Sequence, residues 1–273
     1  MHKTVAQAVT PLIRATGLGK TFSRRGRRVE ALAGVSLAVA PGEFVTVLGP
    51  SGCGKSTLLR LLGGLHEVTT GDVTVGGRPP AVARAAKQFG FVPQAPALVP
   101  WKTLGDNVRF LSRLHRGGGD HPPMGDEAID GLLATVGLDS FAGSYPHELS
   151  GGMQQRAALV RAFALGAPIL LMDEPFAALD EITRADMRYL LLDIWSQRRQ
   201  TVVFVTHSIT EAVTLSDRVL VMAAHPGRIV AEHRIELARP RRPDVEDCEA
   251  FHRHVRELRA ELRAVRLPAV EAS

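Results

Sequence analysis

Gly49-Pro-Ser-Gly-Cys-Gly-Lys-Ser56, with Thr57 directly after it, decides the fold of this chain of 273 residues. The stretch fits G-x-x-x-x-G-K-[ST] at every fixed position, and it lies between an apolar run, residues 43–48, and a helical pattern, residues 56–65. Glycines here let successive backbone N–H groups turn toward phosphate oxygens, and the helix start adds a positive dipole end. We therefore predict a strand, a phosphate-binding loop and a helix, in this order.

The polar side chains of this loop indicate a nucleoside triphosphate with its metal ion. Lys55 would neutralise the β- and γ-phosphates, and Ser56 would bind Mg²⁺ through its hydroxyl. The alternative is a glycine-rich turn that precedes a helix by chance. A dinucleotide-binding loop is excluded, because G-x-G-x-x-G is not present in this stretch.

A pair of acids follows a second apolar run. Residues 168–172 predict a buried strand, and Asp173 and Glu174 come directly after it. This places Asp173 at the carboxyl end of the sheet beside the loop, where it can hold Mg²⁺ through a water. Glu174 is then the general base that orients and polarises the attacking water. The alternative is a cluster of acids that caps a helix.

The remaining pattern predicts an α/β core. Residues 12–47 alternate between apolar and polar positions, which is typical of strands. The runs at 168–172 and 201–206 are apolar or β-branched and a helix separates them, which suits a buried parallel sheet. Residues 98–165 are mostly compatible with helices, with a loop at 117–125. We find no repeated segment.

Composition excludes other classes of protein. Hydrophobic residues make up 45% and charged residues 22%, so the chain is neither disordered nor an integral membrane protein. No stretch reaches the roughly 18 apolar residues of a spanning helix, and residues 1–20 contain no signal peptide, so we expect a cytoplasmic protein. The net charge of +5 leaves nucleic acid or an anionic membrane face open as partners.

The two cysteines, Cys53 and Cys248, lie far apart and have no metal-binding spacing, so we expect neither a disulfide nor a zinc site. Cys53 lies inside the loop, where the helix dipole and Lys55 both favour a thiolate. We expect its pKa to lie below about 8.5 and the thiol to be alkylated quickly. The alternative is a small residue whose sulfur points into the sheet and never meets reagent.

The end of the chain has a pattern of its own. Residues 239–243, Arg-Pro-Arg-Arg-Pro, indicate a linker. An amphipathic helix is predicted beyond it, because apolar residues recur at spacings of four and three among arginines and glutamates. These residues are Phe251, Val255, Leu258, Leu262 and Val265. We expect the stripe to pack on the body of the same chain, with a partner or a membrane surface as the alternative.

Leu149-Ser-Gly-Gly-Met-Gln-Gln-Arg156 resembles the LSGGQ-type signature of ABC ATPases. Met153 stands where the commonest form has Gln, and Gln154 follows it. Ser150 is a predicted helix N-cap, and the glycines after it leave backbone N–H groups bare for an anion. A cap of the ordinary kind would need no double glycine.

Further motifs of the ABC family follow in the family's order. Gln94 after residues 89–93 looks like the Q-loop, Asp180 at the end of Ala178-Leu-Asp180 like the D-loop, and His207 like the switch histidine. Phe22 matches the aromatic residue that stacks on adenine. The resemblance covers nearly the whole chain apart from the last thirty or so residues.

The resemblance implies a P-loop NTPase core with an N-terminal antiparallel β subdomain and an inserted helical signature subdomain. The ABC ATPase domain would span residues 1–240, with the helical subdomain at about 95–165, and residues 241–273 would form the arginine-rich amphipathic helix. It also implies a division of roles. Glu174, His207 and Gln94 would be catalytic, and Ser56, Gln94 and Asp173 would hold Mg²⁺. The residues that would bind ATP are Phe22, Gly49, Pro50, Ser51, Gly52, Cys53, Gly54, Lys55, Ser56 and Thr57.

The family further implies a head-to-tail homodimer, with each ATP held between one chain's phosphate loop and the other chain's signature, Ser150, Gly151, Gly152 and Gln154. Integral membrane permease subunits would be the main partners, and an extracytoplasmic solute-binding protein would act indirectly, with no nucleic acid involved. The chain would sit peripherally on the cytoplasmic face of the inner membrane. Residues 97–108 and 217–229 look like the nitrate, sulfonate and taurine importer branch, and Trp101 would lie where a coupling helix docks.

Two other functions explain the sequence less well. A soluble ABC-type ATPase acting on ribosomes or DNA would resemble relatives with two tandem domains or a long coiled coil, whereas only 149 − 55 = 94 positions separate Lys55 from Leu149. A small-molecule kinase would explain the phosphate loop but would leave residues 149–156 without a role. Co-purification with a multi-span membrane protein would separate a transporter from both.

Overall fold

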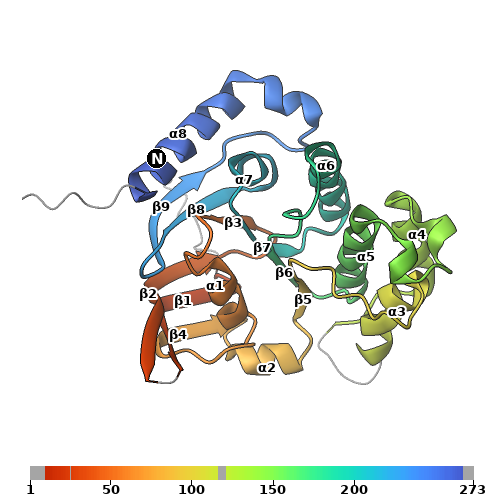
Figure 1. The fold of residues 1–273 in the computed structure, drawn as a ribbon, viewed down its shortest axis with the longest axis horizontal. Helices are drawn as coiled ribbons and strands as arrows, with labels where there is room; N and C mark the ends of the chain where they lie inside the picture. Colours follow the sequence, from red (N-terminus) through yellow and green to blue (C-terminus); the bar gives the residue numbers. More distant parts are fainter. Residues whose placement is uncertain (1–9, 25, 116–120, 267–273) are drawn as a thin grey trace, which may run out of the picture.

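The computed structural model describes residues 10–24, 26–115 and 121–266, which form two sheets with helices packed around them (Figure 1). The smaller sheet is antiparallel, with strand order β2-β1-β4. Its strands are β1 (Ile13–Arg24), β2 (Arg27–Val39) and β4 (Thr70–Val75). The predicted N-terminal antiparallel subdomain is confirmed.

The larger sheet has the order β5-β6-β7-β3-β8-β9, and it is parallel except for the β8–β9 pair. Its strands are β3 (Phe44–Leu48), β5 (Phe89–Val92), β6 (Ile169–Asp173), β7 (Thr201–Thr206), β8 (Arg218–Ala223) and β9 (Arg228–Arg234). Every residue of β3, β6 and β7 is buried. The apolar runs that predicted a buried parallel sheet are therefore its central strands.

Both faces of the larger sheet are covered, and alternate residues serve the two sides. Val45 and Val47 of β3 pack into a core with the antiparallel sheet and helix α1 (Lys55–Leu62). Phe44 packs on the opposite side, in a core that includes α6 (Glu181–Arg198). Figure 1 shows α1 below the large sheet, and α6 and α7 (Ile209–Leu215) above it. This sandwich explains why these strands carry continuous apolar runs.

A helical lobe lies between β5 and β6 in the chain, at the right of Figure 1. It contains α3 (Leu104–His115), α4 (Asp126–Thr135), the short turns η1 (Asp139–Phe141) and η2 (Pro146–Glu148), and α5 (Gly151–Ala164). A further short helix, α2 (Pro80–Ala85), lies between β4 and β5. Residues 121–125 of the predicted loop are not helical, and 116–120 lie outside the described residues.

The C-terminal segment packs on the same chain. The turn η3 (Pro243–Asp247) leads into α8 (Glu249–Arg266), which lies along β9 and α7 in Figure 1. Phe251, Leu258 and Leu262 of α8 share a core with residues of β8 and α7. The apolar stripe is therefore covered by the chain's own body, and residues 267–273 lie outside the described part. Within the described ranges, no helix has the length and apolar character needed to cross a membrane.

Candidate functional site

The carboxyl ends of three neighbouring strands meet at one edge of the large sheet. Leu48, the last residue of β3, pairs with Thr206 at the end of β7, and Asp173, the last residue of β6, pairs with Val205. The phosphate loop, Glu174 and His207 each follow one of these ends directly. Parallel pairing thus brings together three motifs that are spread over more than 150 positions of the sequence, from Gly49 to His207.

The loop backbone requires glycine at two positions. Gly52 and Gly54 have φ values of 80° and 98°, in the left-handed region. A Cβ on Gly54 would also lie 2.9 Å from the carbonyl oxygen of Ala31. The glycines therefore let the loop curve tightly against β2 before α1 begins.

Lys55 is 4% exposed, and its Nζ donates to the carbonyl oxygens of Gly49 at 3.0 Å and Pro50 at 3.1 Å. The same Nζ lies 3.1 Å from Oε1 of Glu174. A buried ammonium with these partners is held across the mouth of the loop, where it can meet an incoming phosphate.

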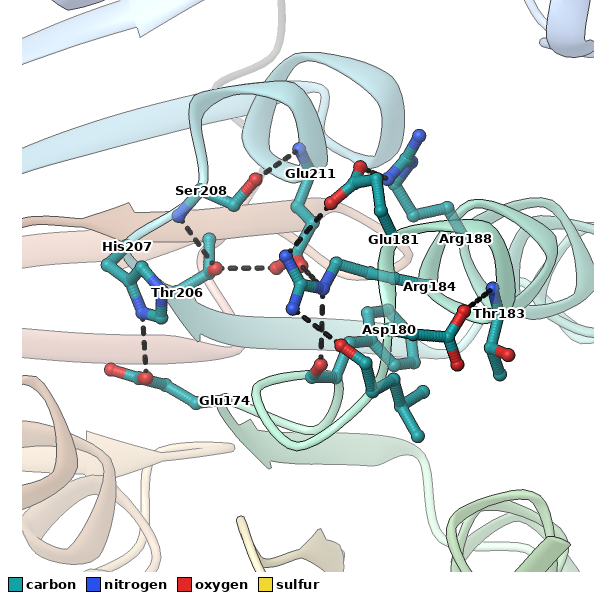
Figure 2. A network of polar contacts seen from close by, with 12 residues as sticks. Glu174, Asp180, Glu181, Thr183, Arg184, Arg188, Thr206, His207, Ser208 and Glu211 are labelled. Atoms are coloured by element: carbon teal, nitrogen blue, oxygen red, sulfur yellow. Dashed lines mark hydrogen bonds and ion pairs between the residues drawn. The ribbon is translucent and has the colours of Figure 1, made fainter. Parts of the chain in front are cut away.

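Glu174 has a φ of 44°, the left-handed region, and its N–H donates to the carbonyl of Val205 at 3.0 Å. This conformation is uncommon for a residue other than glycine. It turns the carboxylate toward Lys55 on one side and toward His207 on the other, whose Nδ1–H donates to Oε2 at 2.9 Å. Figure 2 shows the imidazole of His207 pointing at Glu174. The carboxylate is therefore oriented by Lys55 at one oxygen and by His207 at the other.

A cavity of about 430 Å³ opens at this edge. Gln94, Glu174 and most of the phosphate loop, which the sequence singled out as candidate site residues, line it. The loop residues among them are Ser51, Gly52, Gly54, Lys55, Ser56 and Thr57. Asp173 joins the site behind Ser56, because the Ser56 hydroxyl donates to Oδ1 of Asp173 at 2.7 Å. Gly49 and Pro50 contribute the carbonyls that hold Lys55.

Four lining residues did not follow from the sequence: Val29, Glu30, Ala31 and His225. The first three lie on β2, and His225 lies in the turn between β8 and β9. Gly227 joins the two segments, because it donates to the carbonyl of Ala31 at 3.0 Å. The Pro-Gly pair at 226–227 was a signal of a tight turn, but only tertiary pairing shows which strand it meets.

Phe22, the predicted adenine contact, does not line this cavity. Its ring is 39% exposed, lies edge-on to His66 at 5.7 Å, and has the Lys20 ammonium 5.1 Å from its centroid. Phe22 pairs directly with Val29 across β1 and β2, and paired residues share a face of the sheet. Phe22 therefore stands on the same face as a lining residue, one strand away.

The expectation of a reactive thiol at Cys53 is wrong. Cys53 is 1% exposed and belongs to the core between α1 and the sheets. Burial raises the pKa of its thiol, although the Lys55 ammonium acts in the opposite direction. The alternative, a sulfur packed into the core, is what the structure contains.

The signature residues lie apart from the cavity. Ser150 caps α5, and its Oγ accepts from the N–H of Met153 at 3.3 Å. Gly151 is exposed, and neither it nor Ser150 or Gly152 is among the described residues that line the cavity. The amide of Gln154 donates to the carbonyl of Pro146 at 2.9 Å, so it stabilises the turn before the helix.

The D-loop residue Asp180 is also exposed, and it caps α6. One of its carboxylate oxygens accepts from the N–H of Thr183 at 3.0 Å. This hydrogen bond lowers the pKa of the carboxyl. The cap places the residues between Glu174 and Asp180 in a short, fixed turn at the edge of the site.

Known proteins are similar to this chain in sequence and in fold. The family model described as "ABC transporter" matches residues 32–177. An uncharacterised ABC transporter ATP-binding protein of Methanocaldococcus jannaschii is 46% identical over 84% of this chain and 84% of its own length. The taurine import ATP-binding protein TauB of Rhizobium johnstonii is 44% identical (89% and 91%), and the aliphatic sulfonates import ATP-binding protein SsuB of Bacillus subtilis is 40% identical (86% and 89%).

A solved structure agrees with this result. A dimeric ATP-binding cassette in a post-hydrolysis state, bound to ADP and Pi, superposes with a TM-score of 0.71 at 31% identity, over 83% of this chain and all of that one. The resemblance that the motifs indicated is confirmed, and so is the predicted fold class. The chain belongs to the ABC transporter family, as one of its ATP-binding proteins that hydrolyse ATP.

Proposed function

We propose that the chain energises the import of a small anionic solute, such as nitrate, a sulfonate or taurine, as a homodimer bound to separate membrane permease subunits. One observation carries the proposal. The cavity holds a phosphate loop, a buried lysine and an oriented carboxylate, while the exposed start of α5 at Ser150 lies outside it. One chain therefore offers two half-sites, which a head-to-tail pair would join.

In the proposed reaction, Lys55 and the loop N–H groups hold the phosphates of ATP. Glu174 takes a proton from water as the water oxygen attacks the γ-phosphorus, and the bond from that phosphorus to the β–γ bridging oxygen breaks, which leaves ADP and phosphate. His207 holds the carboxylate at 2.9 Å. Because Lys55 also pairs with Glu174, an arriving phosphate competes for this ammonium and frees the base.

The residues present fit Mg²⁺. The Ser56 hydroxyl and the Asp173 carboxylate lie within 2.7 Å of each other, and Gln94 lines the same cavity. Hydroxyl, carboxylate and amide oxygens are the ligands that this ion prefers, with waters in between. We propose that Ser56 and Gln94 hold the ion and that Asp173 does so through a water. The ion would neutralise charge on the β- and γ-phosphates.

A second copy of the chain would complete the site with its own Ser150, Gly151 and Gly152. The start of α5 is suited to an anion, because its first N–H groups point away from the helix and its dipole is positive there. The dimeric form of the ATP-binding cassette that this fold matches supports the proposal. Asp180, exposed at the start of α6, would lie near the same interface.

Permease contact is proposed for the helical lobe. Trp101, three residues before α3 begins at Leu104, is 76% exposed, whereas Trp195 is 1% exposed in the core. An exposed indole, seven positions after Gln94 in the sequence, is suited to a protein contact because it offers a large apolar area and one donor. We place the chain peripherally on the cytoplasmic face of the inner membrane, with an extracytoplasmic binding protein acting on it indirectly. The names of the taurine and sulfonate relatives support the solute class.

Affinity purification of the tagged chain from detergent-solubilised membranes tests the proposal. We expect a multi-span membrane protein to co-purify, and Trp101→Ala to reduce its recovery while ATP hydrolysis by the isolated chain stays unchanged. Uptake of labelled taurine, an alkanesulfonate and nitrate by cells that lack the chain then identifies the solute. Recovery with ribosomes or DNA, and no membrane protein, would instead support the alternative of a soluble ABC-type ATPase.

A further inference from the structure

A buried glutamate of α7 holds both neighbours of the switch histidine. Oε2 of Glu211, whose side chain is 5% exposed, accepts from the Thr206 hydroxyl at 2.5 Å. The same hydroxyl accepts from the N–H of Ser208 at 3.0 Å, and the N–H of Glu211 donates to Oγ of Ser208 at 3.4 Å. Thr206 and Ser208 flank His207, so Glu211 sets the backbone from which the imidazole projects.

An arginine of α6 holds the turn that follows Glu174. Arg184 donates through Nη2 to the carbonyl of Leu179 at 2.7 Å and through Nε to that of Phe176 at 3.3 Å. Both carbonyls lie between Glu174 and Asp180. The planar guanidinium meets the two carbonyls through two separate nitrogens in a fixed fork, a geometry that the single nitrogen of a lysine ammonium does not reproduce.

The two holding groups meet. Nε of Arg184 lies 3.9 Å from Oε1 of Glu211, and Figure 2 shows the resulting chain of contacts from His207 across to the start of α6. Burial raises the pKa of the Glu211 carboxyl, while the Thr206 hydroxyl and the Arg184 guanidinium act against this rise. A buried carboxylate is costly to keep, and an apolar side chain would fill the space more cheaply. The Glu211–Arg184 pair is therefore better explained by the arrangement that it imposes on the two turns than by a contribution to the stability of the fold.

We propose that Glu211 and Arg184 are positioning residues that hold the turns after β6 and β7 in one arrangement, so that His207 keeps Glu174 aligned for hydrolysis. Neither residue lines the cavity among the described residues, so they act through His207 and Glu174. The inference rests on the proposed roles of those two residues.

Glu211→Gln and Arg184→Lys test the pair. Gln keeps the shape and still accepts from Thr206 but loses the charge that faces Arg184, and Lys keeps the charge but replaces the rigid two-nitrogen fork with a single nitrogen. We expect kcat for ATP to fall about 10- to 100-fold in each, as for misplacement of a catalytic group by about 1 Å, with KM and the melting temperature nearly unchanged.

Glu43→Gln is the matched control. Glu43 forms a partly buried ion pair with Arg218 at 2.8 Å, with its side chain 18% exposed. It lies just before the first residue of β3 and so at the opposite end of that strand from the loop. The same chemical change there should leave kcat at the wild-type value. An equal fall of kcat in Glu43→Gln would overturn the proposal, because the loss of any such ion pair, far from the site, would then lower kcat by destabilising the fold as a whole.

Two readouts separate positioning from mere stabilisation. In a His207→Ala background, Glu211→Gln should lower kcat by less than twofold further, whereas independent effects would multiply. Where His207→Ala leaves too little activity, the Cε1–Hε1 resonance of His207 should shift in Glu211→Gln and Arg184→Lys and stay in place in Glu43→Gln. An unmoved resonance, or multiplied effects, would overturn the proposal. Failure of the proposed function is seen separately, as absent hydrolysis in the wild type or full hydrolysis in Glu174→Gln.

Discussion

The starts of α1 and α5 resemble each other locally and differ in everything around them. Each has glycines at its start, before the first residue in α1 and as the first two residues in α5, and each leaves backbone N–H groups without helical partners. At α1, Lys55 is 4% exposed and pairs with Glu174, and Ser56 bonds Asp173. At α5, Ser150 caps the helix and Gly151 is exposed.

The sheet is the cause of the difference. The loop before α1 follows β3, and β7 and then β6 come next in the sheet, so the carboxylates at the end of β6 lie beside the loop: Asp173 accepts from Ser56 and Glu174 pairs with Lys55. The turn before α5 lies on the helical lobe (Figure 1), and the residues at the start of α5 are not among the described residues that line the cavity. The N-terminus of a helix can bind an anion without further groups. The charged side chains that would activate water lie at the strand ends of the large sheet. We therefore expect ATP to be hydrolysed at the start of α1, and the start of α5 to contact the ATP that is held by a second copy of the chain.

The largest effect is expected for the carboxylate at the sheet edge. Glu174→Gln should lower turnover about 10²- to 10⁴-fold, the usual contribution of general base catalysis, while ATP still binds and an ATP-bound dimer accumulates. Steady-state hydrolysis and size-exclusion chromatography with ATP measure the two results. Hydrolysis at the wild-type rate would show that Glu174 is not the base.

At the second helix start, Ser150→Arg should lower hydrolysis by about 10²- to 10³-fold, as for the loss of one preorganised anion contact, and should prevent the ATP-dependent dimer. Nucleotide binding by the monomer should stay nearly intact, because Ser150 lies outside the cavity. Mixing the variant with Glu174→Gln chains and measuring dimer size tests contact in trans. A monomer that fails to bind ATP would mean that Ser150 acts only as a structural cap.

A smaller effect on affinity is expected at the first helix start. Lys55→Ala removes a charged hydrogen bond worth roughly 1.5 to 3 kcal/mol, so the Kd for ATP should rise about 10- to 150-fold. Titration with a fluorescent nucleotide measures it. Lys102→Ala, which removes a lysine that lies over the Phe110 ring on the helical lobe, is the control. An unchanged Kd in Lys55→Ala would contradict the phosphate-loop assignment.

The smallest effect is expected for the cysteine beside Lys55. Because Cys53 is 1% exposed and burial raises the pKa of its thiol, a maleimide should modify Cys248 and leave ATP hydrolysis nearly unchanged. Peptide mapping after labelling locates the adduct. Rapid modification of Cys53 that bound Mg-ATP slows would show that the loop opens in solution.

Local sequence was sufficient where the chemistry lies on one continuous stretch. Residues 49–57 specify their loop because glycines, lysine and serine act through backbone geometry within one turn of chain. The apolar runs before Asp173 and at 201–206 likewise predicted central strands, since only a strand buried on both faces tolerates them.

The sequence decided less wherever packing between distant segments sets the outcome. Cys53 has neighbours that favour a thiolate, yet the core around α1 buries its sulfur. Val29 lies at the cavity through its place on β2, and His225 through the hydrogen bond from Gly227 to Ala31. Glu211 meets Arg184 because α7 packs beside α6. The sequence by itself thus determines which motifs are present, because each motif depends on the residue types within one short stretch of backbone. The solvent exposure of a side chain, the charges near it and the residues in contact with it depend on long-range packing, which only the folded chain establishes.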